Sequence, residues 1–211
     1  MSMTRRTIGC LAATLLSFAA LGVQAQAKAP EALIKEVSTD VLEAVKADKT
    51  IQAGDLRKVI ALVDQKVLPY VNFQRMTASA VGRYWKQATP DQQKRLQEEF
   101  KLLLVRTYSG ALSQVSSEQT VELRPMRSAP TDNEVVVRTE IKGKGDPIQL
   151  DYRLEKAGDS WKIYDVNVLG VWLVENYRNS FAQEIGANGI DGLIAKMAER
   201  NKSAAAGGAK S

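Results

Sequence analysis

The feature of this sequence that most constrains its fold is a change in the spacing of apolar residues near Thr120. Before Thr120 they recur at helical intervals, as in Leu96 and Phe100, and after it they alternate with polar residues, as in Leu150 and Tyr152. Intervals of three to four residues are typical of an amphipathic helix, and an interval of two is typical of a half-buried strand. The chain therefore predicts one α+β domain, with helices gathered against one face of a curved sheet.

The alternating half of the chain predicts a four-stranded antiparallel meander, because short turns separate its apolar segments. The expected strands cover residues 121–125, 135–141, 148–154 and 161–163, and the expected turns cover 132–133, 143–146 and 157–159. After Asp165 the apolar phase slips, since Val166 and Val168 are out of step with Ile163. A β-bulge, or a strand buried on both faces, would explain this slip.

The helical half begins with amphipathic patterns that end at Asp48 and at Pro69. A short helix from 71 to 82 precedes the longest one, expected from Pro90 to about Val115, with Thr89 as its N-cap and Gln92 as the capping-box partner. An aromatic-rich helix is expected to open at Gly170 after the strands, and a last short helix follows around 190–197.

The N-terminus is typical of a cleaved signal peptide. Arg5 and Arg6 precede an apolar stretch over residues 8–23, and Ala25-Gln26-Ala27 supplies an A-x-A cleavage site. A membrane anchor is disfavoured because the apolar stretch is short for a span of about 20 residues. The expected organisation is a signal peptide (1–27), one domain (28–201) and a disordered, low-complexity tail (202–211).

Composition removes several classes of chemistry. The 211 residues contain no histidine, and the single cysteine, Cys10, lies in the expected leader. Ser-His-Asp and Cys-His catalysis and histidine metal sites are therefore excluded, and the exported domain has no disulfide. The leader also carries Arg5 and Arg6, so 27 basic residues face 24 acidic ones after cleavage. This mild excess, interleaved along the chain, gives little reason to expect a nucleic acid partner.

The sequence gives little support for other catalytic sites. Asp151, Asp165 and Glu175 could be imagined as paired acids, but alternation places Asp151 on the polar face of the sheet. Ser109 and Ser113 lie in no G-x-S-x-G elbow and have no histidine base. A Ser-Lys pair stays formally possible. We therefore expect a binding function, no enzyme activity, no cofactor and no metal.

Two blocks of the chain resemble one known family. Residues 158–181 read G-D-S-W-K-I-Y-D-V-N-V-L-G-V-W-L-V-E-N-Y-R-N-S-F, and residues 82–85, 89–93 and Phe100 provide a G-x-Y-W piece, a capped helix start and a phenylalanine. In order and spacing these blocks are similar to the MlaC, or toluene-tolerance, family of periplasmic phospholipid carriers, apart from one extra residue between Gly158 and Trp161.

The resemblance implies a function as well as a fold. Such a protein is a monomeric periplasmic shuttle that holds the acyl chains of a phospholipid in an apolar pocket between the sheet and a helical layer. It exchanges lipid with an outer-membrane lipoprotein complex and with an inner-membrane substrate-binding protein of an ABC transporter, which maintains outer-membrane lipid asymmetry. Phospholipid is then cargo and not a cofactor.

The residues expected to line this pocket are the apolar and aromatic side chains of the two blocks and of the sheet face. They are Phe73, Met76, Phe100, Leu104, Tyr108, Val137, Leu150, Tyr152, Ile163, Val166, Leu169, Trp172, Tyr177 and Phe181. Residue patterns alone leave a second hypothesis open, because aromatic stripes usually pack in a core. In that case the chain is a periplasmic adaptor of a membrane complex, with a dry core and no lipid.

Overall fold

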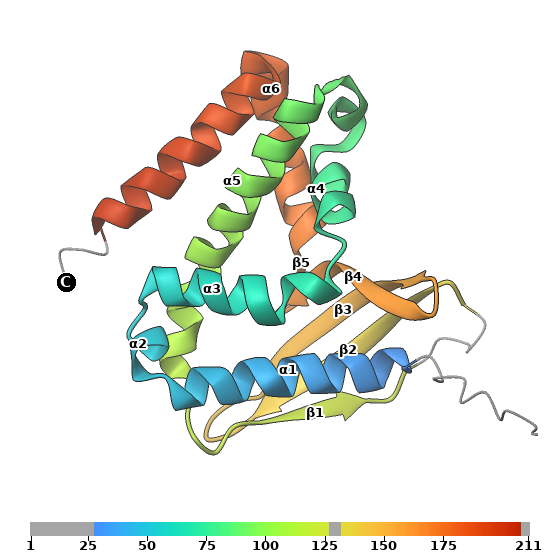
Figure 1. Cartoon of the computed structure of the whole chain (residues 1–211), viewed down its shortest axis with the longest axis vertical. Coiled ribbons are helices and arrows are strands. Elements are labelled where there is room, and N and C mark those ends of the chain that lie inside the picture. Colours follow the sequence, from blue (N-terminus) through green and yellow to red (C-terminus); the bar gives the residue numbers. More distant parts are fainter. Residues whose placement is uncertain (1–27, 127–131, 208–211) are drawn as a thin grey trace, which may run out of the picture.

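Helices come first along the chain and strands second, as the change of apolar spacing predicts. The computed structural model describes residues 28–126 and 132–207. The expected signal peptide and residues 208–211 lie outside the described residues. A curved sheet forms the base, α1 lies along it, and three helices, α4, α5 and α6, stand on it (Figure 1). None of the helices within the described residues is long and apolar enough to cross a membrane.

The sheet has five antiparallel strands in the order of the sequence, one more than the four predicted. The extra strand has two residues, which is too short for a period-2 pattern to reveal. The strands are β1 (Thr120–Arg124), β2 (Glu134–Lys142), β3 (Ile148–Ala157), β4 (Ser160–Val168) and β5 (Val171–Trp172).

A β-bulge in β4 explains the phase slip of the sequence. The register of β3 and β4 shifts between Arg153 and Leu154, which leaves Tyr164 as the extra residue on β4. One extra residue reverses the direction of the side chains that follow. Val166 and Val168 therefore return to the apolar face of the sheet, and of the two explanations for the slip the bulge is confirmed.

The chain leaves β4 through a tight turn that starts the last helix later than predicted. Leu169 and Gly170 have φ angles of 52° and 91°, which a right-handed helix does not contain. The Asn167 side chain closes this turn by accepting a hydrogen bond of 2.8 Å from the Gly170 amide. The prediction of a helix that opens at Gly170 was therefore wrong, because β5 intervenes and α6 begins at Leu173.

The helical half follows the predicted order. The capping box at Thr89 and Gln92 is present, but the helix predicted from Pro90 to about Val115 ends at Ser109, and a 3-10 helix continues it. The elements are α1 (Pro30–Ala47), α2 (Lys49–Gln52), α3 (Leu56–Lys66), η1 (Leu68–Tyr70), α4 (Phe73–Val81), η2 (Gly82–Gln87), α5 (Pro90–Ser109), η3 (Gly110–Gln114) and α6 (Leu173–Gly207).

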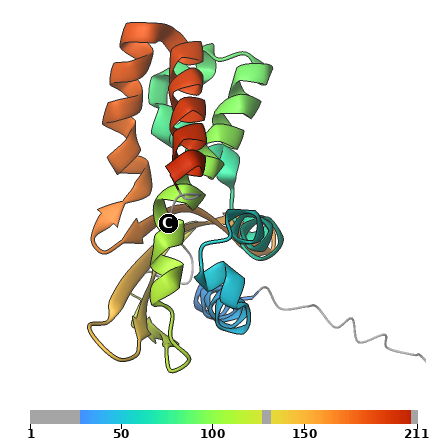
Figure 2. The same ribbon diagram turned by 90° about the vertical axis from the view of Figure 1, so that its left-hand side faces the viewer.

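Helix α6 combines the last two predicted helices and folds back on itself. It is broken at Gly189, whose φ of 71° is not helical, and its second arm returns beside α5 (Figure 2). Glycine takes this conformation without the steric penalty that other residues meet. Residues 202–207, expected to begin a disordered tail, continue the helix in the structure.

An aromatic core holds the upright helices together. Phe100 of α5 is fully buried, and its ring centroid lies 5.1 Å from that of Tyr177 and 5.3 Å from that of Phe181. Both contacts are edge-on, which the ring quadrupoles favour. A second core lies between α1 and the sheet, where Leu33 and Ile34 are buried.

A buried carboxylate fastens the start of α6 to the sheet. Asp165 accepts hydrogen bonds from the Val174 amide at 3.1 Å and from the Arg153 guanidinium at 2.9 Å. The same guanidinium stacks 3.8 Å from the centre of the Trp172 ring. Burial raises the pKa of Asp165, and the hydrogen bonds from the backbone amides of Val174 and Val166 and from Arg153 only partly offset this effect.

Truncation of Phe100 tests the aromatic core. Phe100→Ala should lower the free energy of unfolding by about 3–5 kcal/mol, because a large buried ring leaves a cavity that its neighbours cannot fill. Urea unfolding followed by circular dichroism measures this change. Leu123→Ala, at a residue that is 39% exposed on β1, is the control and should change little. Equal losses in the two variants would contradict this assignment of the core.

The carboxyl of Asp165 predicts a dependence of stability on pH. Its pKa is higher in the folded chain than in the unfolded one, so its contribution to stability is lost as pH rises from about 4 through the raised pKa. Asp165→Asn cannot ionise, and it should therefore gain stability relative to the wild type between about pH 4 and pH 7. Urea midpoints at both pH values measure this. Asp146→Asn, in the exposed turn after β2, is the control for the change from a carboxyl to an amide.

Candidate functional site

The apolar face of the sheet is only partly covered by helix α1. Val135, Val137, Leu154, Trp161 and Ile163 pack against α1. The remaining part of the face, which includes Leu150 and Val168, borders a cavity of about 370 Å³. The helices lie away from the sheet at this place. The wall opposite the sheet is therefore formed by several elements from the first half of the chain.

The cavity walls are almost entirely apolar. Helices α3, η1, α4, α5 and η3 contribute one side, and β2, β3, β4 and the start of α6 contribute the other. The lining residues are Val63, Val67, Leu68, Val71, Phe73, Met76, Lys101, Leu104, Val105, Tyr108, Ala111, Leu112, Gln114, Val115, Gln119, Ile141, Ile148, Leu150, Val166, Val168 and Leu173.

The few polar groups that line the cavity are either paired with other groups of the protein or uncharged. Lys101 is the only charged residue among those that line it, and its Nζ lies 2.8 Å from Asp64 Oδ1 on α3. Burial raises the pKa of Tyr108, so its phenol stays protonated at neutral pH. The Gln119 side chain accepts a hydrogen bond of 3.3 Å from the Ser116 amide. The interior therefore presents little that could hold a polar ligand.

This arrangement suits the burial of an apolar ligand. Among the described residues there is no group of three or more Asp, Glu, His or Cys side chains that could hold a metal ion. The walls offer aliphatic and aromatic contact, and burial of apolar surface contributes about 25 cal/mol for each Å² removed from water. Cavities of roughly 300–1,000 Å³ with apolar walls are typical of small-molecule sites.

Six of the fourteen residues expected to line a pocket meet at this cavity. They come from α4, α5, β3 and β4, which are distant in sequence and are brought together by the stacking of the upright helices on the sheet. These six are Phe73, Met76, Leu104, Tyr108, Leu150 and Val166.

Three of the other expected residues lie in the aromatic core, and three lie under α1. Phe100, Tyr177 and Phe181 pack against one another between α5 and α6. Val137, Tyr152 and Ile163 face α1, and the Tyr152 hydroxyl lies 3.2 Å from the Ser38 hydroxyl. Their neighbours are side chains of the protein itself, so the structure separates them from the cavity.

The last two expected residues lie outside both cores. Leu169 is 66% exposed in the turn after β4, and Trp172 is covered by the Arg153 guanidinium on the opposite face of the sheet. The bulge at Tyr164 and the turn at Leu169 decide these positions. Counting residues from Trp161 at an interval of two therefore places neither Leu169 nor Trp172 correctly.

Sequence reasoning missed the contribution of α3 and η3 to the cavity. Val63 and Val67 belong to the amphipathic pattern that ends at Pro69, and Leu112 and Val115 end the longest predicted helix. Their apolar spacing was a signal that they are enclosed. It contained no information about whether protein or a cavity lies next to them.

The chain is similar to known proteins over most of its length. A profile described as MlaC protein matches residues 35–199. The chain is 26% identical over 172 residues to the intermembrane phospholipid transport system binding protein MlaC of Haemophilus influenzae, with 80% of each chain covered. It is 26% identical over 197 residues to the toluene tolerance protein ttg2D of Pseudomonas putida, with 90% of each covered.

A solved structure is also similar to this chain. It is described as the phospholipid-binding protein from Ralstonia solanacearum in complex with a phospholipid. The TM-score is 0.79 at 46% sequence identity, over 83% of this chain and 98% of the other. This similarity covers the mixed helical and antiparallel architecture described above.

Filling the cavity tests whether it accepts apolar molecules. Leu104→Trp replaces an aliphatic side chain that lines the cavity with a larger indole ring. It should reduce binding of the dye N-phenyl-1-naphthylamine about five-fold or more, because apolar cavities bind apolar molecules of matching size. Dye fluorescence measures this in purified protein. Leu102→Trp, on the same helix but not among the lining residues, is the control. Equal dye binding by the two variants would show that the dye binds elsewhere.

Proposed function

Because the chain belongs to the MlaC protein family, we propose that it is a phospholipid-binding transport protein whose cargo sits in the cavity beside the sheet. The observation that carries this proposal is the apolar cavity itself, with one charged residue among its lining side chains. It lies in a fold shared, at 46% identity, with a protein solved in complex with a phospholipid.

The physical chemistry of phospholipids explains why such a cavity is needed. Each methylene buried away from water contributes about 0.8 kcal/mol, so a lipid with two acyl chains crosses water only at a prohibitive cost. We propose that the acyl chains occupy the cavity and that the polar headgroup stays at its mouth. The cavity of about 370 Å³ lies near the lower end of the range typical of ligand sites, so we propose that it widens when a lipid with two acyl chains enters.

The proposed lining combines residues expected from the sequence with residues found in the structure. Phe73, Met76, Leu104, Tyr108, Leu150 and Val166 belong to both sets. Val63, Leu112, Ile148 and Val168 are added, because they complete the walls formed by α3, η3 and the sheet. Binding is then a matter of shape and apolar contact, and no catalytic role is proposed.

Location and partners follow from the same proposal. We place the protein in the periplasm, after removal of the leader predicted over residues 1–27. The proposed partners are an outer-membrane lipoprotein complex and an inner-membrane substrate-binding protein of an ABC transporter, between which the chain carries lipid. A loaded cavity does not empty into water, for the reason given above, so release requires contact with a partner.

Native mass spectrometry of the mature protein tests this function. The wild type should carry phospholipid. Leu150→Gln should lose most of it, because an amide without a hydrogen-bond partner costs about 1–3 kcal/mol in an apolar site, or roughly 5–150-fold in affinity. Leu123→Gln, exposed on β1, is the matched control and should keep its lipid. A wild-type protein without stoichiometric phospholipid would instead favour an adaptor that acts through its surface alone.

A further inference from the structure

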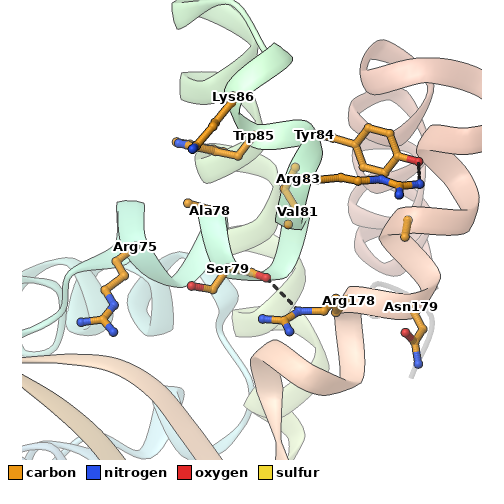
Figure 3. A pocket seen from close by; sticks show the side chains of 12 residues that line it. Arg75, Ala78, Ser79, Val81, Arg83, Tyr84, Trp85, Lys86, Arg178 and Asn179 are labelled. Carbon is orange, nitrogen blue, oxygen red and sulfur yellow. Dashed lines mark hydrogen bonds between the residues drawn. The ribbon is translucent and has the colours of Figure 1, made fainter. Parts of the chain in front are cut away.

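A groove distinct from the cavity runs between η2 and the first arm of α6. It has a volume of about 650 Å³, and its walls come from α4, η2 and α6 (Figure 3). Gly82, with a φ of 66°, ends α4 and turns the chain into η2, which forms one side of the groove. Arg178 on α6 faces this side and donates a hydrogen bond of 3.1 Å from its Nε to the carbonyl of Ser79.

The groove is strongly cationic. Arg75, Arg83, Lys86 and Arg178 border it, and none of its lining residues is acidic. Arg75 is neutralised, because it forms ion pairs with Glu134 and Glu155. Within residues 28–126 and 132–207, the other three make no ion pair with an acidic side chain. Three uncompensated cations therefore surround one concave surface.

The floor of the groove is apolar. Ala78, Val81 and Ala182 lie between the cationic side chains, and Trp85 adds an aromatic ring that is only half-buried. The Arg83 guanidinium donates to the Tyr84 hydroxyl at 3.0 Å, which holds this cation beside the groove. An apolar floor with positive walls is complementary to a segment with an apolar face and acidic flanks.

The groove and the cavity share two helices. Phe73 and Met76 of α4 line the cavity, and Ala78 and Ser79 of the same helix line the groove. Likewise, α6 contributes Leu173 to the cavity and residues one to three turns later to the groove. A molecule seated in the groove would therefore contact the elements that form a wall of the cavity.

We propose that this groove is a docking site for an acidic amphipathic peptide segment of a partner protein. Carboxylates of the segment pair with Arg83, Lys86 and Arg178, and its apolar side chains rest on Ala78, Val81 and Trp85. Because the groove shares α4 and α6 with the cavity, a peptide that binds in the groove can also affect the release of cargo. This last consequence rests on the proposed function, whereas the docking site does not.

A concave shape favours a peptide over an anionic membrane. A flat lipid surface would reach the exposed tips of Arg83 and Lys86, but it would leave the apolar floor between them uncovered. A peptide helix can place one face on the floor while its flanks meet the cations, as in other helix-in-groove complexes. Pairing between exposed charges weakens as salt rises, so the affinity should fall with ionic strength.

Charge reversal tests the groove directly. The probe is a fluorescein-labelled amphipathic peptide of about 15 residues composed of Glu, Leu and Ala, and fluorescence anisotropy measures its binding. R83E/K86E should bind it about ten-fold or more weakly than the wild type. K35E/R57E carries the same change in net charge at exposed positions on α1 and α3, and it should bind as the wild type does. Equal binding by R83E/K86E and the wild type would overturn the proposal.

Two further measurements separate the alternatives. The first uses vesicles of phosphatidylcholine and phosphatidylglycerol. If the vesicles bind the wild type but not R83E/K86E, and the peptide binds neither, the proposal is overturned in favour of membrane docking. Native mass spectrometry should find the same phospholipid in R83E/K86E as in the wild type, because neither residue lines the cavity. The wild type could lack lipid and still bind the peptide more tightly than R83E/K86E does. That result would contradict the carrier function and support the docking site.

Discussion

Helix α1 packs on the sheet through Leu33, Ile34 and Val37, and it reaches only one part of the apolar face. The position of the cavity depends on this limited contact between α1 and the sheet. Where α1 lies, the sheet is sealed by protein. Where it does not, Leu150 and Val168 border a cavity whose far wall is made by helices standing on the sheet. One continuous apolar surface is thus divided between a core that α1 covers and a cavity.

The upright helices can stand away from the sheet because they have a core of their own. Phe100, Tyr177 and Phe181 supply contacts among α4, α5 and α6 that do not require the sheet. The bulge at Tyr164 and the buried carboxylate of Asp165 then join this helical unit to β4. A separate core and a narrow junction leave room between the two layers without loss of the packing that stabilises each of them.

Helix α4 links the two surfaces that the structure offers to other molecules. One side of it carries Phe73 and Met76 to the cavity, and its C-terminal turn carries Ser79 to the cationic groove. The hydrogen bond between Arg178 and Ser79 fixes α4 to α6 at this place. In the proposed function, cargo and partner therefore contact the same helix, which gives a physical route by which the binding of one can alter the release of the other.

The order of helices and strands, the capping box at Thr89 and the bulge near Asp165 could be predicted from the sequence, because spacing and capping are local properties. The absence of histidine likewise removed Ser-His-Asp and Cys-His catalysis before any fold was known. The sequence also identified Leu150 and Ile163 as members of one apolar face. Only the tertiary structure decided that Leu150 borders a cavity and Ile163 packs under α1, since burial against protein and burial against a ligand impose the same apolar pattern.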